Sequence, residues 1–125
     1  MNTILVIEDN HDYRADLMEI LKFENYATLG AENGQVGLQM IRQHSPNLIV
    51  CDVDMPVMTG IEVLKSAKTD PKFAKIPFLI VSGSIDKITR KTSHDLAAEA
   101  YLTKPIDIPE FLSTIVGFLG AQAPV

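Results

Sequence analysis

The chain has 125 residues, of which 46% are hydrophobic, and its formal net charge is −5 at pH 7. This length suits one domain, and the hydrophobic fraction excludes wholesale disorder because a sizeable core can form. The negative charge excludes a general affinity for nucleic acid or anionic membranes. The single cysteine, Cys51, excludes an internal disulfide. No apolar run approaches the ~18 residues of a membrane span, and the N-terminus lacks the long apolar run of a signal peptide. We therefore expect a cytoplasmic domain.

Short apolar runs alternate with helical patterns along the whole chain. In chain order, the pattern predicts a strand over 4–7, a helix over 10–25, a strand over 26–31, a helix over 34–45, a strand over 48–51, a helix over 59–70, a strand over 78–83, a helix over 85–100, a strand over 100–103 and a helix over 106–120. The strands are nearly all apolar, as in sheets that are covered on both faces. The alternation therefore predicts a parallel sheet with helices on both sides.

Apolar residues at helical spacing indicate which helix faces lie against this sheet. In the first helix, which Asn10 is placed to cap, they are Tyr13, Leu17, Ile20, Leu21 and Phe23. In the last helix they are Phe111, Leu112, Ile115, Val116 and Leu119.

Polar residues accompany the ends of four of the five predicted strands. They are Glu8 and Asp9 after the first strand, Asp52 and Asp54 after the third, Ser82 with the fourth and Lys104 after the fifth. Ligands of such sheets bind beyond the carboxyl ends of the strands. We therefore expect these side chains to gather at one edge and to form the functional site.

Three of the four acids among them, Glu8, Asp9 and Asp52, would repel one another at pH 7 when brought close together. Either some of them are protonated or a cation lies among them. Oxygen ligands without a nearby histidine or cysteine suit Mg²⁺ rather than zinc. A metal and a lysine can neutralise the charge of a transferring phosphoryl group, and a carboxylate can be the nucleophile that accepts it. The residue types therefore indicate phosphoryl chemistry.

At this point the chain resembles the receiver domains of two-component response regulators, which have the CheY-like fold. The resemblance runs from Ile4 to about Leu119. It rests on the acidic pair after the first strand, the run D-x-x-M-P-x-M-x-G from Asp52 to Gly60, Ser82, and the pair Lys104-Pro105. It implies a doubly wound α/β fold with five parallel strands in the order 2-1-3-4-5 and five helices. A receiver domain over 1–120 and a loose tail over 121–125 are the expected organisation.

The resemblance implies a role for each residue of the site. Asp52 matches the phosphoacceptor, Asp9 the acid that binds Mg²⁺ directly, and Glu8 the acid that assists. Asp54 matches the position whose backbone carbonyl ligates the metal. Its side chain, together with Ser84, is expected to tune the rate of dephosphorylation.

The resemblance also implies a switch. Ser82 matches the hydroxyl that moves to the phosphoryl group, Lys104 the lysine beside the phosphate, and Tyr101 the aromatic residue that packs inward when the hydroxyl moves.

The predicted helix over 85–100, which carries the basic residues Lys87, Arg90 and Lys91, would form the partner surface with the fifth strand and the last helix. The phosphodonor would be a histidine kinase or a phosphotransfer protein. The output would be a downstream protein or a further domain, with phosphorylation-dependent homodimers common in the family.

One departure from the family lies before the fifth strand. Many receivers have Gly-Ala-Asp there, whereas this chain has Ala97-Ala98-Glu99. The usual glycine cap of the fourth helix is therefore missing, which leaves the geometry of that helix end open.

Two other functions stay open at this stage. One is a receiver-fold binding module that does not accept a phosphoryl group, against which the complete site argues. The other is a phosphatase like the haloacid dehalogenases, because D-x-D after an apolar strand, as in Asp52-Val53-Asp54, also occurs there. In those enzymes the motif follows the first strand, which it does not here. A flavodoxin is excluded because Glu8 and Asp9 would repel the FMN phosphate.

Simpler interpretations of single residues also stay open: Asp54 as an exposed loop side chain, Tyr101 as ordinary packing and Cys51 as core.

Overall fold

A computed structural model describes residues 1–83, 95 and 97–120 of the chain. Its centre is a five-stranded parallel sheet with the strand order β2-β1-β3-β4-β5. The strands are β1 (Thr3–Ile7), β2 (Ala27–Ala31), β3 (Leu48–Asp52), β4 (Phe78–Ser82) and β5 (Ala100–Thr103). The predicted parallel sheet and its order are confirmed.

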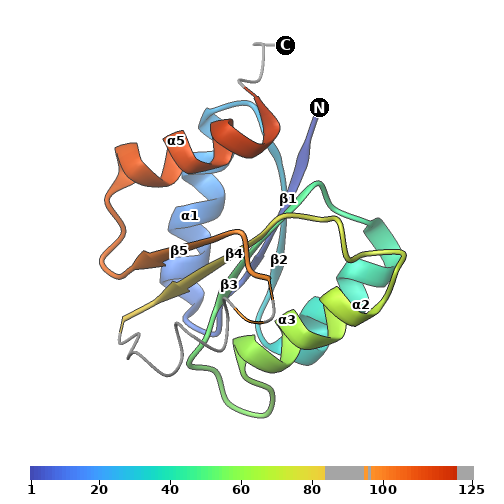
Figure 1. Cartoon of the computed structure of the whole chain (residues 1–125). Coiled ribbons are helices and arrows are strands. Elements are labelled where there is room, and N and C mark those ends of the chain that lie inside the picture. The colour runs from blue at the N-terminus through green and yellow to red at the C-terminus, as the bar shows by residue number, and fades with distance from the viewer. Residues whose placement is uncertain (84–94, 96, 121–125) are drawn as a thin grey trace.

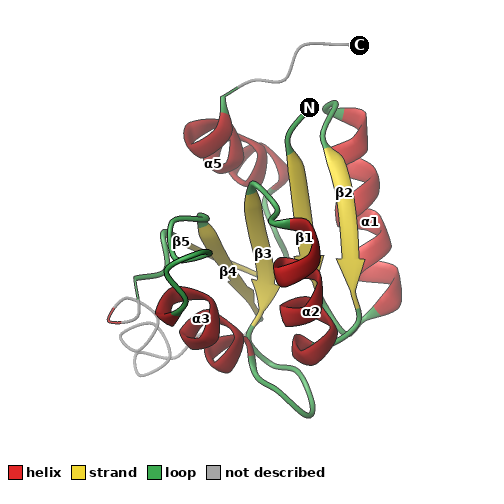
Figure 2. Cartoon of the chain, turned by 90° about the vertical axis from the view of Figure 1, so that its right-hand side faces the viewer, coloured by secondary structure: helices red, strands yellow, loops and turns green. Residues whose placement is uncertain are grey.

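Helices cover both faces of the sheet (Figures 1 and 2). They are α1 (His11–Phe23), α2 (Gly34–His44), α3 (Gly60–Thr69) and α5 (Ile108–Leu119). Helices α1 and α5 lie on one face, and α2 and α3 lie on the other. The helix predicted over 85–100 falls mostly outside the described residues, as does the tail over 121–125. Among the described residues, no helix has both the length and the apolar character needed to cross a membrane.

Alternate residues of the central strands β1, β3 and β4 supply two separate cores. Leu5, Ile49 and Ile80 belong to the cluster that includes α2 and α3 residues, whereas the neighbouring Val6 and Val50 belong to the cluster with α1 and α5. All five side chains are at most 2% exposed. The period-2 alternation of strand side chains thus buries both faces, which is why these strands need an almost continuous apolar sequence.

Side chains cap α1, α2 and α3 where these helices leave the sheet edge, whereas Asp107 at the start of α5 makes no such hydrogen bond. The predicted Asn10 cap is confirmed, because its side chain accepts a hydrogen bond from the Tyr13 backbone N–H at 2.9 Å. Asn33 caps α2 in the same way, and Thr59 and Glu62 form a capping box at α3. These caps fix where each helix begins relative to the strand end before it.

Two residues predicted to face the core are exposed. Phe23, the last residue of α1, is 86% exposed, and Val116 is 41% exposed. Phe23 lies two positions after the buried Leu21, and a step of two residues turns a helix by roughly 200°, to the opposite side. Val116 lies one position past the buried Ile115 and falls at the margin of the apolar stripe of α5.

Glu99, which directly precedes β5, connects neighbouring parts of the chain through its carboxylate. Its carboxylate accepts hydrogen bonds from the backbone N–H of Phe78 at 2.6 Å and from the Lys68 ammonium at 2.5 Å. Lys68 also donates to the carbonyls of Ala74 and Ile76. The end of α3, the start of β4 and the start of β5 are therefore tied together at the edge opposite the polar strand ends.

Candidate functional site

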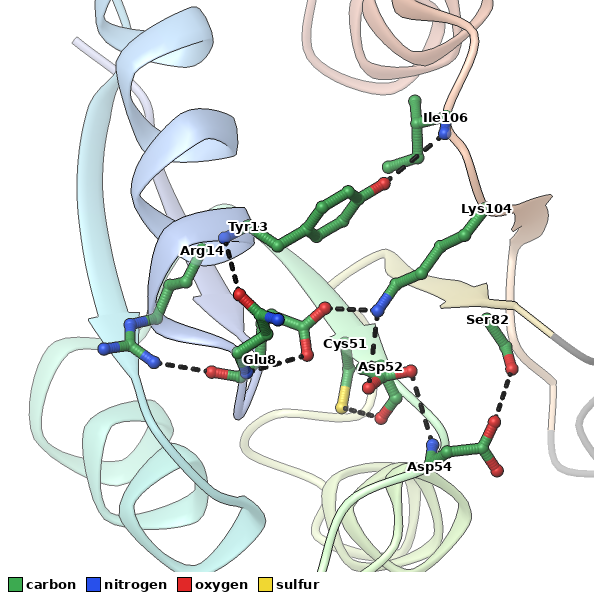
Figure 3. Close-up of polar contacts among 10 residues, drawn as sticks. Glu8, Tyr13, Arg14, Cys51, Asp52, Asp54, Ser82, Lys104 and Ile106 are labelled. Atoms are coloured by element: carbon green, nitrogen blue, oxygen red, sulfur yellow. Dashed lines mark hydrogen bonds and ion pairs between the residues drawn. The ribbon is translucent and has the colours of Figure 1, made fainter.

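The carboxyl ends of β1, β3, β4 and β5 bring the predicted residues together at one edge of the sheet (Figure 3). Asp52 is the last residue of β3 and Ser82 is the last residue of β4. Glu8 directly follows β1, and Lys104 directly follows β5. The expectation that these side chains meet is confirmed by the contacts among them.

Asp52 lies at the centre of the site and is only 5% exposed. One carboxylate oxygen lies 3.6 Å from the Lys104 ammonium, and the other accepts a hydrogen bond from the Asp54 backbone N–H at 3.3 Å. Burial raises the pKa of Asp52, and the nearby positive charge of Lys104 opposes that shift. The carboxylate is thus a partly desolvated anion that a cation would stabilise.

Glu8 is also buried, at 2% exposure, and it pairs with Lys104. The backbone of Glu8 is held on both sides, because its N–H donates to Ala31 and its carbonyl accepts from the Arg14 guanidinium at 2.7 Å. Burial disfavours the charged form of Lys104, but the Glu8 hydrogen bond and the charge of Asp52 outweigh it and raise the pKa of Lys104. Lys104 is therefore a fixed positive charge between two acids.

Glu8, Asp9 and Asp52 form a set of possible metal ligands. One carboxylate oxygen from each lies within 4.8 Å of the others. All three donors are hard oxygens, and one of them, Asp9, faces solvent, so a bound ion could keep water ligands. Burial, a hydrogen bond with Glu8 and the charge of Glu8 raise the pKa of Asp9. This donor set fits Mg²⁺, which prefers oxygen ligands and retains water.

Asp54 and Ser82 contact each other across the site. The Ser82 hydroxyl, which is fully buried, donates a hydrogen bond to the Asp54 carboxylate at 3.0 Å. Asp54 is exposed as a residue, but its side chain has a defined partner. The role of its backbone carbonyl in metal binding stays a prediction. Ser84, the second residue expected to tune the rate, lies outside the described residues.

Tyr101 lies in the middle of β5 and is half-buried. It packs against the core cluster shared with α2 and α3. This packing agrees with an aromatic residue next to the sheet, and the switching role of Tyr101 stays a prediction. Cys51 is fully buried beside Asp52 and belongs to the core, as expected.

Sequence reasoning missed two residues that contact the site, Tyr13 and Arg14. The Lys104 ammonium lies 4.6 Å from the centre of the Tyr13 ring, and the Tyr13 hydroxyl accepts a hydrogen bond from the Ile106 backbone N–H at 3.4 Å. The apolar spacing of the first helix assigns Tyr13 only to the core. Its place in the first turn of a helix that starts at the acidic strand end was the available signal, because side chains there lean back toward that end.

Comparisons with known proteins agree with this geometry. The response regulator receiver domain family matches residues 4–116 of the chain. The polar-differentiation response regulator DivK of Brucella anthropi is 31% identical over 118 residues, which cover 94% of this chain and 96% of that protein.

Solved structures are similar over the same length. The signal receiver domain of a signal transduction histidine kinase from Syntrophus aciditrophicus has a TM-score of 0.89 at 26% identity, covering 100% of this chain and 95% of that one. The chemotaxis protein CheY4 of Vibrio cholerae, at 24% identity, shares the fold with a TM-score of 0.89 over 94% of this chain and 98% of its own. With the family match over most of its length and the acids, serine and lysine assembled at one sheet edge, this chain belongs to the response regulator receiver domain family.

Proposed function

We propose that residues 1–120 form a phosphoacceptor switch. Asp52 accepts a phosphoryl group from a phosphohistidine of a histidine kinase or a phosphotransfer protein. The observation that carries this proposal is the position of the buried Asp52 carboxylate, 3.6 Å from Lys104 and inside the acid set that could hold Mg²⁺. We also propose that the protein acts in the cytoplasm, where the catalytic domains of histidine kinases lie.

In the proposed reaction an Asp52 oxygen attacks the phosphorus of the phosphohistidine. A new O–P bond forms while the P–N bond breaks, and its electron pair leaves with the imidazole nitrogen. Lys104 exchanges a carboxylate partner for a phosphoryl oxygen and balances its negative charge. Mg²⁺, held by Glu8, Asp9, Asp52 and the Asp54 carbonyl, would supply further charge neutralisation. No other group has to be oxidised or reduced.

The aspartyl phosphate then changes the partners of Ser82. Its hydroxyl leaves the Asp54 carboxylate and turns to a phosphoryl oxygen, and Tyr101 packs further inward. This shifts a two-state population and alters the face formed by β5, α5 and the helix predicted over 85–100. That face controls a downstream protein or a further domain. The protein hydrolyses its own phosphate slowly, with Asp54 and Ser84 tuning the rate, so it acts as a switch rather than as a turnover enzyme.

The test is phosphorylation by a small phosphodonor such as phosphoramidate, followed by intact mass. We expect the mass to increase by one phosphoryl group when Mg²⁺ is present. No adduct should form when EDTA is added before the donor. Asp52→Asn should show no adduct under the same conditions. An adduct on Asp52→Asn, or none on the folded wild-type protein, would reject the proposal. The second result would favour a binding module that does not accept phosphate, and steady release of phosphate from small phosphoesters would favour a phosphatase.

A further inference from the structure

Lys104 is enclosed by three groups from three different parts of the chain. Its ammonium pairs with Glu8, lies 3.6 Å from Asp52 and sits over the face of the Tyr13 ring, 4.6 Å from the ring centre (Figure 3). Two of these groups are carboxylates that Mg²⁺ or a phosphoryl group would engage. The third group is the aromatic ring, which neither ligand would engage. The contact between Lys104 and this ring would therefore persist when either ligand binds.

Tyr13 also holds the backbone that carries Lys104. Its hydroxyl accepts a hydrogen bond from the backbone N–H of Ile106, two residues beyond Lys104. Tyr13 is itself fixed at its backbone, because its N–H donates to the Asn10 cap at 2.9 Å. One side chain therefore connects the first turn of α1 to both the head group of Lys104 and the chain segment behind it.

We propose that Tyr13 is a positioning residue for Lys104 in phosphoryl transfer, an inference that rests on the proposed function. A lysine ammonium is a point charge on a flexible stem, so its place depends on its neighbours. When the phosphoryl group arrives, Lys104 must leave Glu8 without swinging out to solvent. The electron-rich face of Tyr13 attracts the ammonium throughout this exchange and limits the positions that it can reach.

Three variants separate the ring from the hydroxyl. Tyr13→Phe keeps the ring and loses the hydroxyl, whereas Tyr13→Leu and Tyr13→Met lose both and retain an apolar side chain. Tyr26→Phe is the matched control, because it removes the hydroxyl of another tyrosine that packs on the same core cluster and bonds Gly120. Amide NMR spectra establish that each variant is folded.

The first readout needs no phosphorylation. Protons held over an aromatic face resonate upfield, so the terminal methylene protons of Lys104 should be shifted upfield in the wild-type protein and in Tyr13→Phe. They should return to ordinary lysine values in Tyr13→Leu and Tyr13→Met. Ordinary values in the wild-type protein would overturn the proposal at this step.

The second readout is the rate of phosphorylation by phosphoramidate at saturating Mg²⁺. We expect the maximal rate to fall about 3- to 30-fold in Tyr13→Leu and Tyr13→Met, the range that a cation–π contact supports. Tyr13→Phe should keep most of the wild-type rate, and Tyr26→Phe should be phosphorylated as fast as the wild-type protein. The affinity for Mg²⁺ should stay within about twofold, because Tyr13 does not belong to the acid set.

The two proposals fail in different ways. If the wild-type protein accepts phosphate and Tyr13→Leu and Tyr13→Met accept it equally fast, the positioning role is overturned and the proposed function stands. If Tyr13→Phe is as slow as Tyr13→Leu, the hydroxyl alone matters and the ring contact is overturned as the cause. If the wild-type protein accepts no phosphate, the proposed function falls, and the positioning role falls with it.

Discussion

The hydroxyl of Ser82 donates a hydrogen bond to the carboxylate of Asp54 at 3.0 Å and so joins the end of β4 to the loop after β3. If Ser82 turns to a phosphoryl group on Asp52, this bond has to break. In the proposed switch, Asp54 therefore stabilises the unphosphorylated arrangement relative to the phosphorylated one.

The first prediction concerns this bond. Asp54→Ala removes the acceptor and should favour the phosphorylated arrangement by about 0.5–1.5 kcal/mol, the net range of an ordinary hydrogen bond. Binding of the phosphoryl mimic beryllofluoride should then tighten by about 2- to 12-fold. The measurement is a titration followed by the amide shifts of Ser82 and Tyr101. Asp54→Asn, which keeps an acceptor oxygen, is the control, and tightening in both variants would mean that charge rather than the hydrogen bond is responsible.

The second prediction concerns the stability of the metal-free protein. The folded-state pKa of Asp52 is raised by burial above its ordinary value of 3.8, so the fold disfavours the ionised carboxylate. The free energy of unfolding therefore falls as pH rises from that ordinary value through the raised pKa. Asp52→Asn escapes this loss and should be more stable than the wild-type protein at pH 7 without Mg²⁺.

The measurement for Asp52→Asn is thermal unfolding at pH 7 and at pH 3 in EDTA. The gain over the wild-type protein should shrink at pH 3, where the wild-type carboxylate is largely protonated in both states. A gain that is the same at both pH values would show that it does not come from the ionised carboxylate.

Much of this site could be predicted from the sequence because it depends on strand ends. Apolar runs marked the strands, and a parallel sheet necessarily collects their carboxyl ends at one edge, which is how Asp52 and Lys104 were placed together. The partners of individual side chains could not be read in this way. The bond between Ser82 and Asp54 depends on the path of a loop, and the ring of Tyr13 reaches Lys104 across the gap between α1 and the segment after β5. Phe23 was misplaced because its hydrophobicity suggested burial that its angular position on α1 does not allow.

The third prediction concerns Mg²⁺. An ion that binds only the folded protein stabilises it by about 1.4 kcal/mol at ten times its dissociation constant. The pKa of Asp9 is raised, so protons compete with the ion as pH falls toward that pKa. The stabilisation by Mg²⁺ should therefore be larger at pH 7 than at pH 4, which lies close to the ordinary value of 3.8 above which the pKa of Asp9 is raised. Calorimetric titration at both pH values measures it, and Asp9→Asn should weaken binding and flatten the pH dependence. An affinity that is equal at both pH values would argue against ligation by Asp9.

The fourth prediction concerns the departure before β5. Ala97 has a φ of 66°, a left-handed conformation in which many receivers have glycine. An alanine in that conformation is disfavoured by about 1 kcal/mol, so Ala97→Gly should stabilise the protein and raise its Tm by roughly 3–5 °C. The neighbouring Ala98, whose φ is not positive and which packs against the core, is the matched control. Ala98→Gly should lower the Tm, and equal effects at both positions would exclude the backbone conformation as the cause.

The last prediction concerns the close approach of α3 to Asp52. A Cβ atom on Gly60 would lie 2.2 Å from the Asp52 carbonyl oxygen and 2.8 Å from the Val53 Cα, both of them backbone atoms that cannot turn away. Gly60→Ala must therefore push the first turn of α3 away from the end of β3, at a cost of about 1–3 kcal/mol. Because Asp52 lies at the point of contact, the rate of phosphorylation should fall together with the stability.

Gly117, in α5, has nothing within 4 Å of the same added atom, so Gly117→Ala should stabilise the protein by up to about 1 kcal/mol through helix propensity and leave phosphorylation unchanged. Chemical denaturation and phosphoramidate kinetics on both variants test this, and a Gly60→Ala protein as stable and as reactive as the wild-type would show that the β3–α3 junction is more adaptable than its close packing indicates.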